Sequence, residues 1–77
     1  MRLLDAVGME GPKAILALKR YLQALPGGAR LEFWADRKVA LHDVPSFCAD
    51  HRHRLLMARE QDGHLVVVIE KSPELVA

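Results

Sequence analysis

The stretch Gly8-Met9-Glu10-Gly11-Pro12-Lys13-Ala14 decides the fold of this chain. It separates a short apolar segment from a strongly helical run. Pro12 suits the first helical position, because its missing N–H would be unpaired there and its fixed φ is already helical. Apolar side chains then recur at steps of three and four residues as far as Leu25, where Pro26-Gly27-Gly28 cannot continue a helix. The pattern predicts a helix over residues 12–25.

The other segments also have readable patterns. Asp36 is a typical residue to cap the second helix with its side chain, and Pro45 within that helix predicts a kink or a break. Gln61-Asp62-Gly63 is a strong hairpin signal between two strand-like segments. The remaining predicted elements are strands at residues 2–7, 29–35, 54–60 and 64–71 and a helix at residues 38–52.

The order of these elements is β-α-β-α-β-β. An order of this kind predicts an α+β two-layer sandwich, with two helices on one face of a four-stranded mixed sheet. The chain has 77 residues, which suits a single domain over residues 1–77. The segment from Ser72 to Ala77 carries no pattern of its own and is expected to be a tail.

Composition excludes several classes of function. The formal net charge is +1, from 11 basic and 10 acidic residues, so broad binding to nucleic acid is disfavoured. The chain has 1 cysteine, Cys48, and therefore no intramolecular disulfide. No segment approaches the ~20 apolar residues of a membrane span, and no secretory signal is visible. We expect a cytoplasmic protein that makes no contact with a membrane.

Three short motifs resemble a known family. Leu4-Asp5-Ala6 followed by Gly8 is similar to the opening of the TusA/SirA family of small sulfur carriers. Asp43-Val44-Pro45-Ser46-Phe47-Cys48 resembles that family's Asp-Ile-Pro-x-Phe-Cys, and His53 falls where the family has a histidine. The resemblance covers almost the whole chain and implies the same two-layer architecture.

The same resemblance draws attention to what the chain lacks. In the family, a Gly-Leu-x-Cys-Pro-x-Pro signature puts a reactive cysteine at the start of the first helix, where it receives a persulfide from a cysteine desulfurase. Here Gly11 stands at the cysteine position and Ala14 replaces the second proline. Glu10 adds a negative charge beside the helix start, where it would repel a thiolate or a persulfide. The usual sulfur-transfer chemistry is therefore expected to be absent.

Cys48 is the only other candidate nucleophile. It shares an apolar stripe with Leu41, Val44 and Phe47, so it is expected to lie in the core and to have a raised pKa. Cys48, His51 and His53 are too few converging ligands to predict a metal site. We expect no metal and no cofactor.

Two surfaces are candidates for binding a partner protein. The first is the helix start, from Glu10 and Gly11 through Pro12 to Lys13. The second is the outer face of the sheet, where Trp34, Val66 and Val68 would form an exposed apolar patch suited to a partner or to a homodimer. In the alternative, the strand at residues 64–71 is central, and long side chains of its neighbours cover its outer face.

Three hypotheses of function follow. The leading one is a TusA/SirA-like protein without the sulfur-accepting cysteine, acting as a protein-interaction or regulatory module related to sulfur transfer. The first alternative is a sulfurtransferase or persulfide carrier that uses Cys48. The second alternative is an RNA-binding module, which rests on analogy of fold alone.

Overall fold

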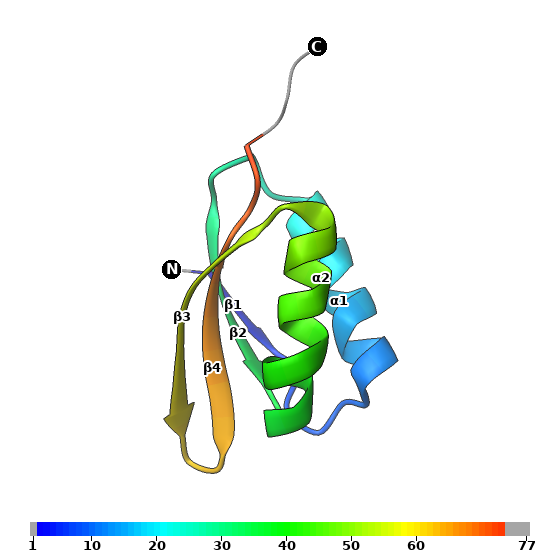
Figure 1. Ribbon diagram of the computed structural model, residues 1–77, viewed down its shortest axis with the longest axis vertical. Helices are drawn as coiled ribbons and strands as arrows, with labels where there is room; N and C mark the ends of the chain where they lie inside the picture. Colours follow the sequence, from blue (N-terminus) through cyan, green and yellow to red (C-terminus); the bar gives the residue numbers. More distant parts are fainter. Residues whose placement is uncertain (1, 74–77) are drawn as a thin grey trace.

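The predicted element order is confirmed in the computed structural model, which describes residues 2–73. Two helical segments form one layer and a four-stranded sheet forms the other (Figure 1). Of the predicted tail, Ser72 and Pro73 are described, and residues 74–77 lie outside the described residues. The elements are β1 (Arg2–Asp5), α1 (Gly11–Gln23), β2 (Arg30–Ala35), the π-helical segment η1 (Val39–Asp43), α2 (Val44–His51), β3 (Arg54–Gln61) and β4 (His64–Glu70).

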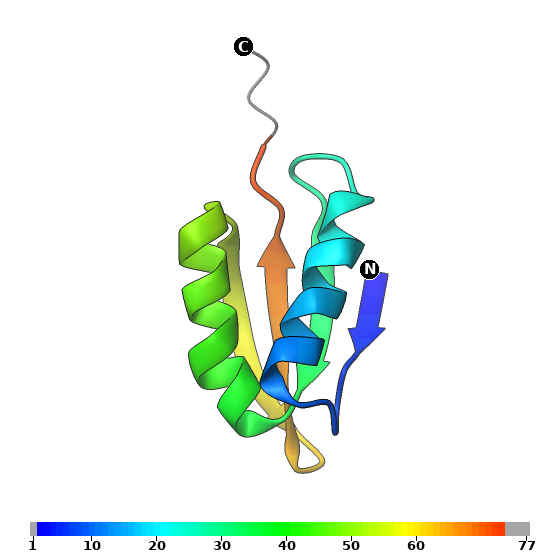
Figure 2. The same cartoon turned by 90° about the vertical axis from the view of Figure 1, so that its right-hand side faces the viewer.

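The sheet has the strand order β1-β2-β4-β3. β1 and β2 are parallel, whereas β4 is antiparallel to both of its neighbours. A parallel pair needs a crossover connection, and α1 supplies it. Figure 2 shows α1 and the second helix side by side on the same face of the sheet. The sheet is therefore mixed, as the element order predicted, and β4 is an interior strand.

The boundaries of the first elements differ slightly from the predicted ones. β1 ends at Asp5 and not at residue 7, because the Asp5 carboxylate accepts a hydrogen bond from the Val7 N–H (3.0 Å) and turns the chain. Gly8 follows with φ +85°, a conformation that glycine adopts without strain. α1 ends at Gln23, two residues before the predicted position.

Asp36 does not cap the second helix with its side chain, so that prediction was wrong. Its carbonyl accepts from the Ala40 N–H (3.0 Å) and begins the helix, but its carboxylate accepts from the Gly8 N–H (3.1 Å). The side chain thereby joins the β1–α1 turn to the end of β2. The contact is invisible in the local sequence pattern because the two partners are 28 residues apart.

The predicted disturbance at Pro45 takes the form of a π-helical segment. The chain is helical from residue 37 to residue 51, with η1 immediately before α2. The Val44 N–H donates to the Val39 carbonyl, a step of five residues. Pro45 has no N–H to donate to the preceding turn, and the wider turn accommodates that missing hydrogen bond. The helix therefore continues without a break.

The hairpin prediction is confirmed. Asp62 and Gly63 both have positive φ, at +50° and +86°, as a tight two-residue turn requires. β3 and β4 pair on either side of the turn, with an irregularity between Leu55 and Met57. Leu56 is therefore displaced from the regular alternation of the strand.

The core lies between the helices and the inner face of the sheet. Every element except β1 and β3 contributes buried apolar side chains, and the fully buried large ones are each worth ~1.5–3 kcal/mol of transfer free energy. Cys48 belongs to this cluster, as the apolar stripe predicted. The larger members are Leu18, Leu22, Leu31, Phe33, Val44, Phe47, Val67 and Ile69.

The outer face of the sheet differs from the predicted apolar patch. Val66 is 0% exposed and Val68 is 8% exposed, so neither presents a surface. β4 is central, and Val66 lies between Trp34 of β2 and Arg59 of β3. The expected exposure of these two valines was wrong, because neighbouring long side chains cover them, which was the alternative. Whether this face binds a partner stays a prediction.

Trp34 is half-buried on the same face. Its indole N–H donates to Glu32 Oε1 (2.8 Å), and its ring lies 4.9 Å from that of His64. The apolar side chains that this face does expose are Leu3 of β1 and Met57 of β3, at 45% and 54%. They belong to the two edge strands, β1 beside β2 and β3 beside β4.

His53 holds the C-terminal segment to the end of α2. Its Nδ1 accepts a hydrogen bond from the Ser72 N–H (3.0 Å). Burial lowers the pKa of His53, and the charges of His51 and Lys71 lower it further. The folded chain thus favours the neutral imidazole, since a proton on Nδ1 would break the bond to Ser72.

This contact predicts that stability falls on acidification. The pKa of His53 in the folded chain lies below the ordinary 6.5, so on acidification the unfolded chain takes up this proton before the folded chain does. His53 therefore adds to the unfolding free energy above pH 6.5, and this contribution is lost as the pH falls through the folded-state pKa. We expect the unfolding free energy of the parent protein, measured by urea denaturation, to rise between about pH 5 and about pH 7.5. The rise should be smaller for His53→Gln. His42→Gln, an exposed control, should retain the parental pH dependence. Equal pH dependence of the parent and His53→Gln would contradict the assignment.

Candidate functional site

The start of α1 is built by backbone geometry more than by side chains. The Met9 N–H donates to the Ala6 carbonyl (3.1 Å), which closes the turn after β1. Glu10 is extended (φ −67°, ψ 156°), makes no side-chain cap and is followed by Gly11 and Pro12 in the first helical turn. The geometry that begins the helix is therefore complete although position 11 carries no side chain.

Glu10 and Lys13 lie on the surface beside this turn. The Lys13 ammonium is 3.7 Å from Glu10 Oε1, and about three quarters of each side chain is exposed. Solvent screens such a pair, which is worth at most about 1 kcal/mol. The two side chains are exposed and do not shape the turn, and their contact with a partner stays a prediction.

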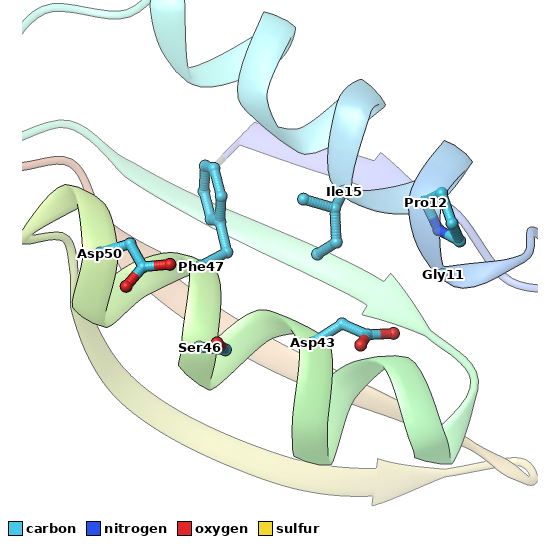
Figure 3. A pocket seen from close by; sticks show the side chains of 7 residues that line it. All are labelled: Gly11, Pro12, Ile15, Asp43, Ser46, Phe47 and Asp50. Atoms are coloured by element: carbon cyan, nitrogen blue, oxygen red, sulfur yellow. The ribbon is translucent and has the colours of Figure 1, made fainter.

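A hollow of about 350 Å³ lies between the start of α1 and the facing wall of the second helix (Figure 3). The Phe47 side chain projects toward α1, and the Asp43 side chain projects toward the start of α1. The lining contains two carboxylates and no basic side chain. Its residues are Gly11, Pro12, Ile15, Asp43, Ser46, Phe47 and Asp50.

The structure thus brings part of the predicted site together and separates the rest. Gly11 and Pro12 lie at the hollow, but Trp34 is on the outer face of the sheet, in the opposite layer. The sequence analysis missed Asp43, Ser46 and Asp50 as members of the site. Their spacing by three and four residues places them on one helical face, a signal that could have found them.

Asp43 occupies the direction in which a side chain at position 11 would point. A Cβ atom at Gly11 would lie 2.5 Å from Asp43 Oδ2 and 3.4 Å from its Cγ. The first distance is too short for an ordinary contact, so the carboxylate would have to turn aside. A glycine at position 11 therefore lets η1 place a negative charge directly over the helix start.

Cys48 is unsuited to nucleophilic chemistry. It is 3% exposed, belongs to the core cluster and is not among the residues that line the hollow. Burial raises the pKa of its thiol to about 11. The thiol is therefore protonated at neutral pH and has no access to a partner, whereas the thiolate is the nucleophilic form.

The nearby histidines do not complete a metal centre with Cys48. His51 Nδ1 lies 3.1 Å from the Phe47 carbonyl, and the His53 Nδ1 position is taken by Ser72. Within residues 2–73, no three histidine, cysteine or acidic side chains converge as metal ligands.

A separate finding concerns membranes. Within residues 2–73, no helix is long and apolar enough to cross one.

The burial of Cys48 predicts slow thiol labelling. A small disulfide reagent at about pH 8 should label Cys48 in the native protein at least tenfold more slowly than in denaturant, because burial disfavours the thiolate. An exposed-thiol control is Ala49→Cys in a Cys48→Ser background, since Ala49 is exposed one residue further along α2. Equal native and denatured labelling rates of the parent would show that the thiol is accessible.

The chain is similar to sulfur carriers over almost all its length. The family model described as "Sulfurtransferase TusA" matches residues 2–71. The sulfur carrier protein TusA of Pseudomonas fluorescens is 32% identical over 69 residues, which are 90% of this chain and 83% of that protein. The sulfur carrier protein TusA of Pseudomonas savastanoi pv. phaseolicola is 30% identical over 71 residues, 92% of this chain and 84% of that protein.

A solved structure shows the same fold. The crystal structure of the SirA-like protein from Desulfitobacterium hafniense superimposes with a TM-score of 0.78 at 19% identity, covering 94% of this chain and 99% of that one. Its two-layer architecture agrees with the sheet and helices described above. The resemblance seen in the sequence is therefore confirmed: this chain belongs to the TusA/SirA-like family of sulfur carriers.

Proposed function

We propose that this chain is a TusA-family protein that no longer carries sulfur and acts as a protein-interaction or regulatory module in a sulfur-transfer system. The observation that carries the proposal is the geometry at position 11. Gly11 has no side chain, and the Asp43 carboxylate covers the place that a side chain would enter. The scaffold around the family's reactive position is kept, but the reactive group is not.

Covalent sulfur transfer requires an accessible thiolate. The single thiol of the chain is buried, and burial raises its pKa to about 11. Transfer through Cys48, the first alternative, would require α2 to leave the core before each reaction. That rearrangement would expose Phe47 and Val44 along with the thiol, at a cost of several kcal/mol.

The hollow beside Gly11 is suited to docking a partner without a covalent bond. The hollow beside Gly11 has an apolar floor that includes Ile15 and Phe47, and Asp43 and Asp50 make it acidic. A partner that places a basic side chain there would find charge complementarity without any basic residue in the lining to oppose it. The proposed partner is a protein of a sulfur relay, which would bind this chain as it binds a carrier.

The proposal also covers RNA binding, self-association and cellular location. RNA binding remains disfavoured by the net charge of +1. Self-association through the outer sheet face would have to use Leu3, Trp34 and Met57, since Val66 is covered. A cytoplasmic location is part of the proposal and rests on the sequence pattern.

The first test measures sulfur loading. The protein is incubated with a cysteine desulfurase and cysteine, and its intact mass is recorded before and after reduction. We expect no reducible gain in mass for the parent, and a gain of one sulfur atom for Gly11→Cys, which restores the thiol. Asp43→Asn added to Gly11→Cys should speed loading, because it removes a negative charge beside the new thiol. A gain in the parent that Cys48→Ser abolishes would establish the rival mechanism.

The second test measures docking. Excess parent protein should slow sulfur transfer from the desulfurase to a thiol-bearing TusA relative by competing for the same surface. Asp43→Lys with Asp50→Lys should weaken this inhibition several-fold, because both charges line the hollow. Asp50→Lys alone should weaken the inhibition in part, and Glu60→Lys on β3, which changes the net charge as that single variant does, is its matched control. If the parent does not inhibit, or if the control weakens inhibition equally, the proposed docking surface is wrong.

A further inference from the structure

A second hollow, of about 240 Å³, lies at the other end of the contact between the two helices. It is formed by the last turns of α1 and α2 together with the segment that leaves β4. Its lining consists of Lys19, Leu22, Gln23, Phe47, His51, His53, Lys71 and Ser72. Phe47 also lines the first hollow, so the two lie on either side of one buried ring.

The charge of the second hollow is opposite to that of the first. Two lysines and two histidines line it, and the lining contains no carboxylate. These groups come from separate parts of the fold: Lys19 from α1, His51 from α2 and Lys71 from the segment after β4. Their convergence is a tertiary effect, since the two lysines are far apart in the sequence.

Several donors at this hollow are oriented and available. Because a backbone N–H only donates, the bond from Ser72 makes His53 Nδ1 the acceptor, and the neutral imidazole carries its proton on Nε2. Because a carbonyl only accepts, His51 Nδ1 donates to Phe47 and is held in place. Lys71 donates one of its three N–H groups to the Leu25 carbonyl and keeps two.

The floor of the hollow is apolar. Leu22 and Phe47 are both buried beneath the charged rim. An inorganic anion would use the rim alone, whereas a molecule with an apolar body and one negative head would use both. A hollow of this size admits a ring-sized body, smaller than a drug-sized ligand.

We propose that this hollow is a binding site for a small organic carboxylate with an aromatic or branched apolar body. The carboxylate lies among Lys19, His53 and Lys71, and the apolar body packs on Leu22 and Phe47. This site does not depend on the function proposed above, because none of its charged residues lines the hollow beside Gly11.

The surroundings of His53 support the assignment. The charges of His51 and Lys71 add to burial in lowering the pKa of His53, so the place is positive before any ligand arrives. A carboxylate bound there offsets those charges and raises the pKa of His53. Lys19 from α1, His51 from α2 and Lys71 after β4 are the other titratable groups of the lining.

The test uses sodium benzoate as the probe and NMR as the readout, at constant ionic strength. Benzoate should shift the amide signals of His51, His53 and Ser72 in a saturable manner and raise the pKa of the His53 imidazole. Lys19→Gln and Lys71→Gln should each weaken binding several-fold. Lys19 is exposed and makes no ion pair with a described residue, so its replacement leaves the fold intact. Lys38→Gln, which removes an exposed lysine outside the hollow, should bind benzoate as the parent does.

Two comparison ligands make the result decisive. Benzyl alcohol has the ring without the charge, and inorganic phosphate has the charge without the ring; both should bind more weakly than benzoate. Equal binding of benzyl alcohol would show that the cations play no part, and equal binding of phosphate would show that the apolar floor plays none. Either result overturns the proposal, as would an unsaturable benzoate response or an equal effect of Lys38→Gln.

Discussion

The parallel pairing of β1 with β2 is the constraint on which the arrangement of this molecule depends. A parallel pair cannot be joined by a tight turn, so the chain must return across the sheet, and α1 is that return. The Asp36 carboxylate then holds the Gly8 N–H at 3.1 Å, which joins the turn before α1 to the end of β2. Since the second helix begins at the same place, the start of α1 must face η1. The contact between Gly11 and Asp43 follows from these backbone constraints.

The start of α1 does not need a side chain at position 11. The turn into α1 rests on the positive φ of Gly8, the extended backbone of Glu10 and the fixed φ of Pro12, and none of these involves a side chain at position 11. Glycine at that position leaves the space over the helix start to Asp43. The Asp43 carboxylate therefore lies over the start of α1 without any demand on the core.

Acidic and basic side chains line separate hollows along the contact between the two helices. Asp43 and Asp50 line the hollow that reaches Gly11, and Lys19 and Lys71 line the other, with Phe47 in the lining of both. A net charge of +1 conceals this separation, because opposite charges cancel in the total while remaining apart in space. Composition alone argued against a broad positive surface and gave no hint of the local charges.

Local chemistry made much of the fold predictable from sequence. Pro12 and the apolar stripe located α1, and Asp62-Gly63 located the hairpin, because each of these features acts within a few residues. The burial of Cys48 was also predictable from the apolar stripe to which it belongs.

Contacts between distant segments decided the burial of the outer sheet face and the make-up of the candidate site. Val66 is covered because β4 lies between β2 and β3, and strand order is not encoded in alternation along one strand. Asp43 became part of the site because packing of η1 against α1 brings distant residues together, a relation that only the tertiary structure specifies.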